Sequence, residues 1–286
     1  MYIKKVSLSL ILFQFLIATP FLMEESIAVV PYYHLPTISN LEKESLSIGK
    51  SAYQLLYFGQ IKQSLNLAKL AISLNDKDAK LWAILAEAQM ANQQNDKALK
   101  SIEKGQKINP KMSELYFAES SIYLIEKKYK KAKESIVEGL AIKPRNPSAI
   151  FQLGNIYLIE KKYKKAIETF NESLKLDKNF WQAINNKGLA YFELNKIELA
   201  SNCFKKAISL EKNAESLLGL AVSFQYKDKN ESIKLTKNAL KIDPKYVSNS
   251  YREEQLWGSK IQKSTKELFK LKELKEDIDF AKQYLN

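Results

Sequence analysis

The sequence predicts an all-α protein, a right-handed superhelical solenoid of about six helix-turn-helix repeats that ends in a C-terminal capping helix. Three observations carry this prediction. The chain of 286 residues contains only 8 Gly and 7 Pro, too few for the many turns of a β-sandwich or barrel. The segment YLIEKKYKKA occurs at 123–132 and again 34 residues later, at 157–166. Within the repeats, apolar residues recur at the i, i+3, i+4, i+7 spacing of amphipathic helices.

Residues 1–28 are expected to form an export signal or an N-terminal membrane anchor. Two lysines precede an uncharged run over residues 6–23, and two glutamates follow it. Ser26 and Ala28 supply the small residues of a cleavage site, but the run is also just long enough to span a bilayer, so both readings stay open. Either way, the charge pattern places the rest of the chain outside the cytosol, in a periplasm or a thylakoid lumen.

Residues 29–44 are interpreted as a linker and the start of the first helix, and 45–246 as the solenoid. Its six expected units are 45–78, 79–112, 113–146, 147–180, 181–214 and 215–246. The last unit is two residues shorter, with the deletion in the inter-helix turn near Asp228. Prolines 110, 144 and 244 follow the second helices of their units, where a helix must stop.

Residues 247–286 are expected to form C-terminal capping helices, because a solenoid needs a polar outer surface at its end. The stretches 251–271 and 275–284 both have helical apolar spacing. The second stretch is strongly charged, and the alternative interpretation is that it projects as a partner-binding helix.

The repeats resemble those of the tetratricopeptide repeat (TPR) family, whose period is also 34 residues. The residues at the family's signature places in the unit 147–180 are Leu153, Gly154, Tyr157, Ala166 and Phe170. In the next unit these places hold Gly188, Tyr191, Ala200, Phe204 and Ala207. The resemblance implies that the first helix of each unit lines a concave groove in which ligand peptides bind.

The resemblance also assigns candidate groove-facing residues by their register in the first helices. They are Phe117, Ser121, Leu124 and Ile125 in the third unit, Phe151, Gln152, Asn155, Leu158 and Ile159 in the fourth, and Asn185, Asn186, Leu189 and Phe192 in the fifth.

Asn155 and Asn186 match the family's paired asparagines that hydrogen-bond a bound peptide backbone. A carboxamide suits this role because it donates to a C=O and accepts from an N–H. The alternative is two solvent-facing polar residues in a chain rich in asparagine.

The cations of the family's chaperone-type carboxylate clamp are missing, since those places hold Phe151, Ser216 and Leu220. A chaperone-type acidic tail would therefore have no electrostatic partner.

The formal net charge is +13, but almost every basic residue is lysine, and Arg145 and Arg252 are the only arginines. Base readout and bidentate phosphate contacts depend on arginine, so nucleic acid is not expected as a partner. Attraction to anionic membranes or acidic proteins remains open.

No enzyme chemistry is indicated, and no catalytic residue, cofactor or metal is expected. Phosphate-binding, dinucleotide-binding, zinc-protease and serine-hydrolase motifs are all absent. One Cys and one His exclude a disulfide framework and a histidine-rich metal centre. Cys203 is interpreted as a partly buried, unreactive thiol, and His34 has no evident partner.

The sequence therefore predicts a non-enzymatic scaffold or assembly factor that binds a client polypeptide in its groove, at a membrane reached through the N-terminal segment. Alternatives are a structural subunit of a secretion or envelope complex, and a charge-driven binder of anionic membranes or nucleic acid. The layout, the AT-rich type of composition and the stretch SYREEQLWG at 250–258 also resemble cyanobacterial membrane-associated TPR proteins. That resemblance implies a role in photosynthetic complex assembly or tetrapyrrole synthesis.

Overall fold

The structure of the protein is a computed structural model that describes residues 37–285. The expected export signal or anchor at 1–28 lies outside these residues. Ile38–Asn286 forms one compact unit, and the fold described below is that of this unit.

The described chain is helical throughout and contains no β-strand. Its α-helices are α1 Ile38–Tyr57, α2 Ile61–Leu74, α3 Ala79–Ala91, α4 Asn95–Ile108, α5 Ser113–Ile125, α6 Tyr129–Ile142, α7 Pro147–Ile159, α8 Tyr163–Leu176, α9 Trp181–Glu193, α10 Ile197–Leu210, α11 Ala214–Phe224, α12 Lys229–Ile242, α13 Asn249–Glu254, α14 Ser259–Leu268 and α15 Lys275–Lys282. Three short 3₁₀ helices lie at η1 Pro244–Val247, η2 Lys272–Leu274 and η3 Gln283–Leu285.

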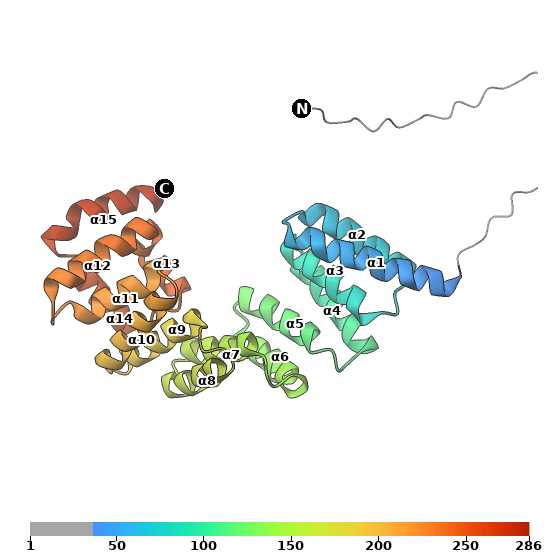
Figure 1. The fold of residues 1–286 in the computed structure, drawn as a ribbon, viewed down its shortest axis with the longest axis horizontal. Coiled ribbons are helices and arrows are strands. Elements are labelled where there is room, and N and C mark those ends of the chain that lie inside the picture. The colour runs from blue at the N-terminus through green and yellow to red at the C-terminus, as the bar shows by residue number, and fades with distance from the viewer. Residues whose placement is uncertain (1–36, 286) are drawn as a thin grey trace, which may run out of the picture. The chain divides into compact units, whose positions relative to one another are not determined.

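The first twelve helices form six antiparallel pairs, and each expected repeat unit contains one pair (Figure 1). Within every unit the two helices pack against each other, and the second helix also packs against the first helix of the next unit. First helices of neighbouring units touch as well, as in α1 with α3 and α9 with α11. The predicted fold class, an all-α solenoid of helix-turn-helix repeats, is confirmed.

Close packing within the units depends on small residues opposite aromatic rings. A Cβ placed on Gly154 of α7 would lie 2.5 Å from a ring carbon of Phe170 on α8, which is fully buried. Phe204 of α10 lies between Gly188 and Gly219, which belong to two successive first helices. The glycines at these places therefore allow each ring to fill the space between helices at close-packed density.

The turn inside each of the first five units has the same backbone geometry. The second residue before the second helix has a left-handed conformation, with φ between 57° and 73°. The residues in this place, spaced 34 apart, are Gly59, Gln93, Lys127, Lys161 and Asn195. The following N–H closes the turn by bonding to a carbonyl five residues back, for example Gln94 N to Gln89 O at 2.8 Å.

The sixth unit lacks this turn because of its two-residue deletion. Its first helix, α11, has 11 residues, whereas α3, α5, α7 and α9 have 13 each. Asp228 replaces the left-handed turn with a side-chain cap, accepting a hydrogen bond from Glu231 N at 3.0 Å.

The C-terminal region differs from the expected pair of end-capping helices. In place of one helix over 251–271 there are two, α13 and α14, joined by a turn at Gln255–Gly258. The helix α14 packs on α9 and α11, which are first helices, and so covers part of the inner surface of the solenoid. The helix α15 packs against α12, the last helix of the repeats, and against η1, and acts as the end cap of the solenoid.

Left-handed turn residues other than glycine carry a steric cost of roughly 1 kcal/mol. We therefore expect Gln93→Gly, at an exposed turn position, to raise the free energy of unfolding by about 0.5–1 kcal/mol. Thermal and denaturant unfolding would measure this change. The matched substitution Gln93→Val is expected to lower stability, because a β-branched residue tolerates positive φ poorly. Equal stability of the two variants would contradict the strain argument.

Candidate functional site

The candidate site lies where the C-terminal part of the chain returns to the first helices of the fourth to sixth units. We call residues 248–269, which comprise α13, α14 and the turn between them, the return segment. Its position is fixed by three sets of contacts: a carboxylate cap, a buried arginine and a tryptophan hydrogen bond.

The carboxylate cap is Glu193, the last residue of α9, which is only 4% exposed. Its Oε1 accepts hydrogen bonds from Lys260 N and Ile261 N, each at 3.0 Å. These are free N–H groups of the first turn of α14, whose own N-cap, Gly258, offers no side chain. Glu193 also lies directly against Gly258, where a Cβ would collide with its carboxylate. A glycine at 258 is therefore what allows the carboxylate to reach the helix terminus.

The buried arginine is Arg252 of α13, which is 1% exposed. Its Nε donates to Gln262 Oε1 at 2.9 Å, its Nη1 donates to the Tyr246 carbonyl, and the guanidinium lies 5.3 Å from the Phe269 ring centre. Burial lowers the pKa of Arg252 to about 10, so the group is still charged at neutral pH. Arg252 thus joins α13, α14 and η1 through one side chain.

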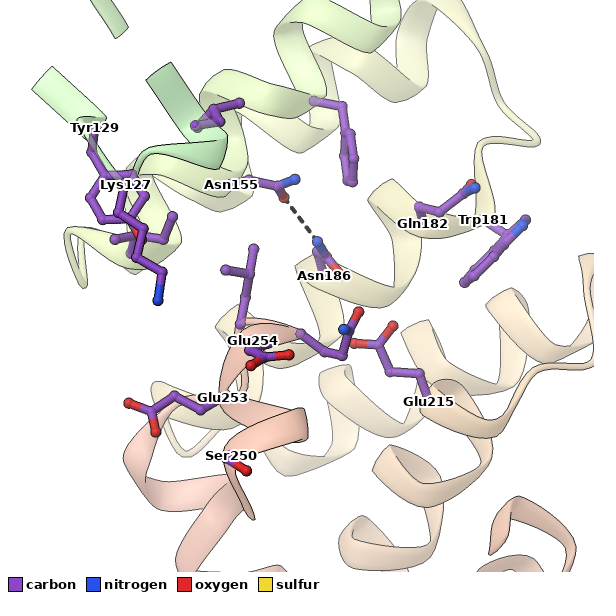
Figure 2. A pocket seen from close by; sticks show the side chains of 15 residues that line it. Lys127, Tyr129, Asn155, Trp181, Gln182, Asn186, Glu215, Ser250, Glu253 and Glu254 are labelled. Atoms are coloured by element: carbon purple, nitrogen blue, oxygen red, sulfur yellow. Dashed lines mark hydrogen bonds between the residues drawn. The ribbon is translucent and has the colours of Figure 1, made fainter. Parts of the chain in front are cut away.

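A line of side-chain hydrogen bonds crosses three successive first helices. Ser216 Oγ on α11 donates to Asn185 Oδ1 at 2.8 Å, and Asn185 Nδ2 donates to Asn186 Oδ1 at 3.1 Å. Asn186 Nδ2 on α9 donates in turn to Asn155 Oδ1 on α7 at 2.8 Å (Figure 2). We call these four residues the amide ladder. At its end, Asn155 Nδ2 makes no hydrogen bond to the described residues, so a donor remains for a ligand.

Asn155 and Asn186 of the amide ladder line a pocket of about 860 Å³ between α5, α7, α9 and the return segment (Figure 2). This volume lies within the range typical of ligand sites. The lining residues are Leu124, Lys127, Tyr129, Phe151, Asn155, Ile159, Trp181, Gln182, Asn186, Glu215, Ser250, Glu253, Glu254, Gln255 and Leu256. A second pocket, of about 560 Å³, adjoins it and shares Tyr129, Ile159, Glu253 and Leu256.

Glu215, in the first turn of α11, is the most electrostatically perturbed carboxylate of the site. Its Oε1 accepts a hydrogen bond from Trp257 Nε1 at 3.2 Å. Burial raises the pKa of Glu215 to about 7, against the opposing effect of hydrogen bonds from Trp257 and Asn185. The group is therefore partly protonated at neutral pH.

The structure brings some of the sequence-predicted groove residues together. Leu124, Phe151, Asn155, Ile159 and Asn186 line the larger pocket, and Leu158 lines the adjoining one. Asn155 and Asn186, which the resemblance assigns as two ligands of a peptide backbone, hydrogen-bond directly to each other. Their role toward a peptide stays a prediction.

Other predicted groove residues do not face open space. Asn185 is fully buried in the amide ladder, and Leu189 and Phe192 lie in the core beneath the return segment with Trp257 and Ile261. The physical reason is that α14 covers α9, which the register argument treated as free.

In the third and fourth units, four more predicted residues point elsewhere. Phe117 packs against Gly139 of α6, and Ser121 Oγ donates to the Phe117 carbonyl at 2.9 Å. Gln152 is partly buried with its Oε1 unpaired, and Ile125 is exposed, but neither lines the pocket.

Sequence reasoning missed every residue that the return segment contributes, including Glu253, Glu254 and Leu256. It also missed Trp181, Gln182 and Glu215, which lie in the first turns of α9 and α11. One signal was present: Gly258, among only 8 glycines, follows Trp257 after the repeat period has lapsed. A glycine there indicates a close backbone approach, although not what it approaches.

Within residues 37–285, no group of three or more His, Cys, Asp and Glu side chains is arranged to hold a metal ion. Cys203 is buried, and burial raises its pKa to about 11, which keeps the thiol protonated and weakly nucleophilic. None of the helices in this part of the chain has the length and apolar content needed to cross a bilayer.

Comparison with protein families gives tetratricopeptide repeat matches in four consecutive stretches, 79–112, 113–146, 147–180 and 182–213. These stretches are the second to fifth units, α3 to α10. These stretches are therefore similar to tetratricopeptide repeats, a fold that generally serves as a non-enzymatic protein-interaction scaffold. Comparison with curated protein sequences gives no match.

Solved structures with the same fold include pilF of Pseudomonas aeruginosa. Its TM-score is 0.66 and its sequence identity is 18%, and the match covers 75% of this chain and 98% of that one. YrrB, described as a TPR protein with an unusual peptide-binding site, gives a TM-score of 0.53 and 18% identity over 65% of this chain and 97% of that one. MamA from Desulfovibrio magneticus gives a TM-score of 0.54 and 19% identity, over 62% of this chain and 98% of that one. At these identities the likeness shows the fold alone. The likeness gives no support to the resemblance to cyanobacterial membrane-associated proteins, which stays a prediction.

Removing the carboxylate cap should release the return segment. We expect Glu193→Ala to lower the free energy of unfolding by about 2–3 kcal/mol, because one buried and one partly buried N–H group lose their acceptor. Hydrogen exchange of the amides at 259–262 should accelerate, while that of α5 to α8 is unchanged. Glu193→Gln keeps one acceptor oxygen and is expected to cost less. Unaltered exchange at 259–262 in the alanine variant would show that the cap does not hold the segment.

The raised pKa of Glu215 predicts that the stability of the protein depends on pH. The folded protein holds this proton more tightly than the unfolded chain, so the contribution of Glu215 to stability falls as pH rises from about 4.5 to about 7. We expect Glu215→Gln to be more stable than the wild type at pH 8 by about 1 kcal/mol or more, with the difference shrinking toward pH 5. Denaturant unfolding at both pH values measures it. The exposed control Glu138→Gln should change stability by less than about 0.5 kcal/mol at either pH.

Proposed function

We propose that this protein is a non-enzymatic scaffold or assembly factor that binds a client polypeptide in the pocket between α5, α7, α9 and the return segment. The observation that carries the proposal is the end of the amide ladder. It offers the unpaired Asn155 Nδ2 beside an apolar wall of Leu124, Phe151 and Ile159, in a pocket of about 860 Å³. A donor next to apolar anchors suits a segment of polypeptide chain.

The binding mechanism follows from the rigidity of the site. Asn155 is held by Asn186, Asn186 by Asn185, and Asn185 by Ser216, so the Asn155 amide is oriented before any ligand arrives. Its free Nδ2 donates to a main-chain carbonyl of the client, whatever the client's side chains are. Because the protein side of the interface is already ordered, the client's own flexibility is the main entropic cost of binding.

The proposal places this activity at a membrane and outside the cytosol. Its support is the apolar run at 6–23 with lysines before it and glutamates after it. A role in photosynthetic complex assembly or tetrapyrrole synthesis gains no support from the stretch 250–258. Arg252, Trp257 and Gly258 in that stretch all have structural partners within the chain, which account for them without a shared function.

The test is a crosslinked capture from native membranes with the full chain as bait. The wild type is compared with Asn155→Ala and with Asn155→Ala/Asn186→Ala, after circular dichroism has shown equal helicity. A client bound in the pocket should bind about three- to tenfold more weakly to Asn155→Ala, the loss of one net hydrogen bond. The exposed control Asn202→Ala, on α10, should bind like the wild type.

Each rival interpretation has its own outcome in this experiment. A structural subunit of a secretion or envelope complex predicts a stoichiometric complex that both alanine variants retain. A charge-driven binder predicts capture of anionic lipid or nucleic acid with an affinity that falls steeply with salt. Either result would contradict the pocket as the client site.

A further inference from the structure

The larger pocket has a charge opposite to that of the chain as a whole. The protein carries 45 Lys and Arg residues against 32 Asp and Glu. Among the residues that line the pocket, three are glutamates, Glu215, Glu253 and Glu254, and only Lys127 is basic. In Figure 2 these three carboxylates come from α11 and α13, on the side of the pocket across from α7.

These three carboxylates form no ion pair with the described residues. Nine carboxylates elsewhere in the described chain do, as in Glu267 with Lys270 at 2.8 Å and Glu273 with Lys229 at 2.7 Å. In a chain with this excess of lysine, three neighbouring glutamates without a cation leave a place for one from outside. Lys127, from the turn between α5 and α6, forms no ion pair with them either.

The packing of the return segment fixes the backbone positions from which the carboxylates extend. Glu215 is held by Trp257 Nε1, and Glu253 and Glu254 flank Arg252, whose guanidinium is buried against Gln262 and Phe269. A cation that enters the pocket therefore meets one oriented carboxylate, Glu215, and two exposed ones on a fixed helix.

The opposite wall of the pocket is apolar. It consists of Leu124, Phe151 and Ile159, with Leu256 between this pocket and the adjoining one. Phe151 is supported from behind by the rings of Phe170 and Phe180, at 5.9 and 4.8 Å between centres. A ligand complementary to both walls carries a positive charge a short distance from apolar groups.

We propose that the pocket selects client segments in which a lysine or arginine lies next to apolar side chains, with the cation placed among Glu215, Glu253 and Glu254. This inference rests on the proposed function and names the chemistry of its client. The aliphatic stem of a lysine or arginine would lie along the apolar wall while its charged end reaches the carboxylates. Acidic segments are rejected by like charge.

The preference is the reverse of the one that the net charge alone predicts. A surface with a charge of +13 attracts acidic peptides, so non-specific binding and pocket binding select opposite ligands. This opposition makes the proposal testable without a known client.

The probe is a phage-displayed library of random twelve-residue peptides, panned against the full chain in detergent. Peptides recovered on the wild type should be enriched in lysine or arginine beside aliphatic or aromatic residues. A synthetic copy of an enriched peptide should bind at least tenfold more weakly to Glu253→Lys/Glu254→Lys. The two glutamate side chains make no hydrogen bond within the described chain, so their replacement removes no contact of the fold. The control Glu134→Lys/Glu138→Lys, on exposed positions of α6, makes the same change in net charge away from the pocket and should bind like the wild type.

The possible results separate this inference from the proposed function. Enriched peptides that are acidic or uncharged, or that bind equally to both lysine pairs, would overturn the charge preference. The peptide pocket itself would still stand if Asn155→Ala weakened the same peptides. Recovery of no peptide on the wild type would overturn the proposed function, and this inference with it.

Discussion

Each helix pair of this protein leaves an apolar surface that only the next pair can cover, and the whole structure depends on this constraint. Residues such as Phe170 and Phe204 are fully buried only because glycines on α7, α9 and α11 allow the neighbouring helices to approach them. The apolar core is therefore continuous along the stacked pairs, and it must be closed off at the first and last pair. At the C-terminal end α15 covers the last pair.

The return segment adds a layer of helices to the repeats and lines one side of the larger pocket. A plain solenoid would leave α9 and α11 open on their inner side, with Leu189 and Phe192 exposed. The return segment instead buries these two residues, and its carboxylates form one wall of the pocket whose other wall belongs to α5 and α7. The inner surface thus changes from a continuous groove into a bounded site, which is more selective in what it admits.

The periodic part of the structure could be predicted from the sequence, and the pocket only in part. The 34-residue spacing fixes which residues occupy equivalent places, so the helix pairs and the location of Asn155 and Asn186 on first helices followed from register, whereas the hydrogen bond between them did not. The burial of Asn185, Leu189 and Phe192 did not follow, because it depends on contacts between Glu193 and residues 67 and 68 positions later. A single contact between residues this far apart produces no repeating pattern in the sequence. The capping carboxylate looks like any other glutamate at a helix end, and only Gly258 indicates that something approaches closely.

The cap at Glu193 also divides the solenoid into two regions of different cooperativity. In the units before α9, helices contact only their own unit and its immediate neighbours, so stability there is a sum of local terms and opening can begin at α1 and proceed stepwise. From α9 onward, the long-range contact ties the fifth and sixth units to the C-terminal helices. These elements should open together or not at all, and they complete their fold only after the last part of the chain has been synthesised. The pocket lies across the boundary between the two regions, so a bound client would transmit stability from the cooperative C-terminal region to the more loosely coupled repeats before it.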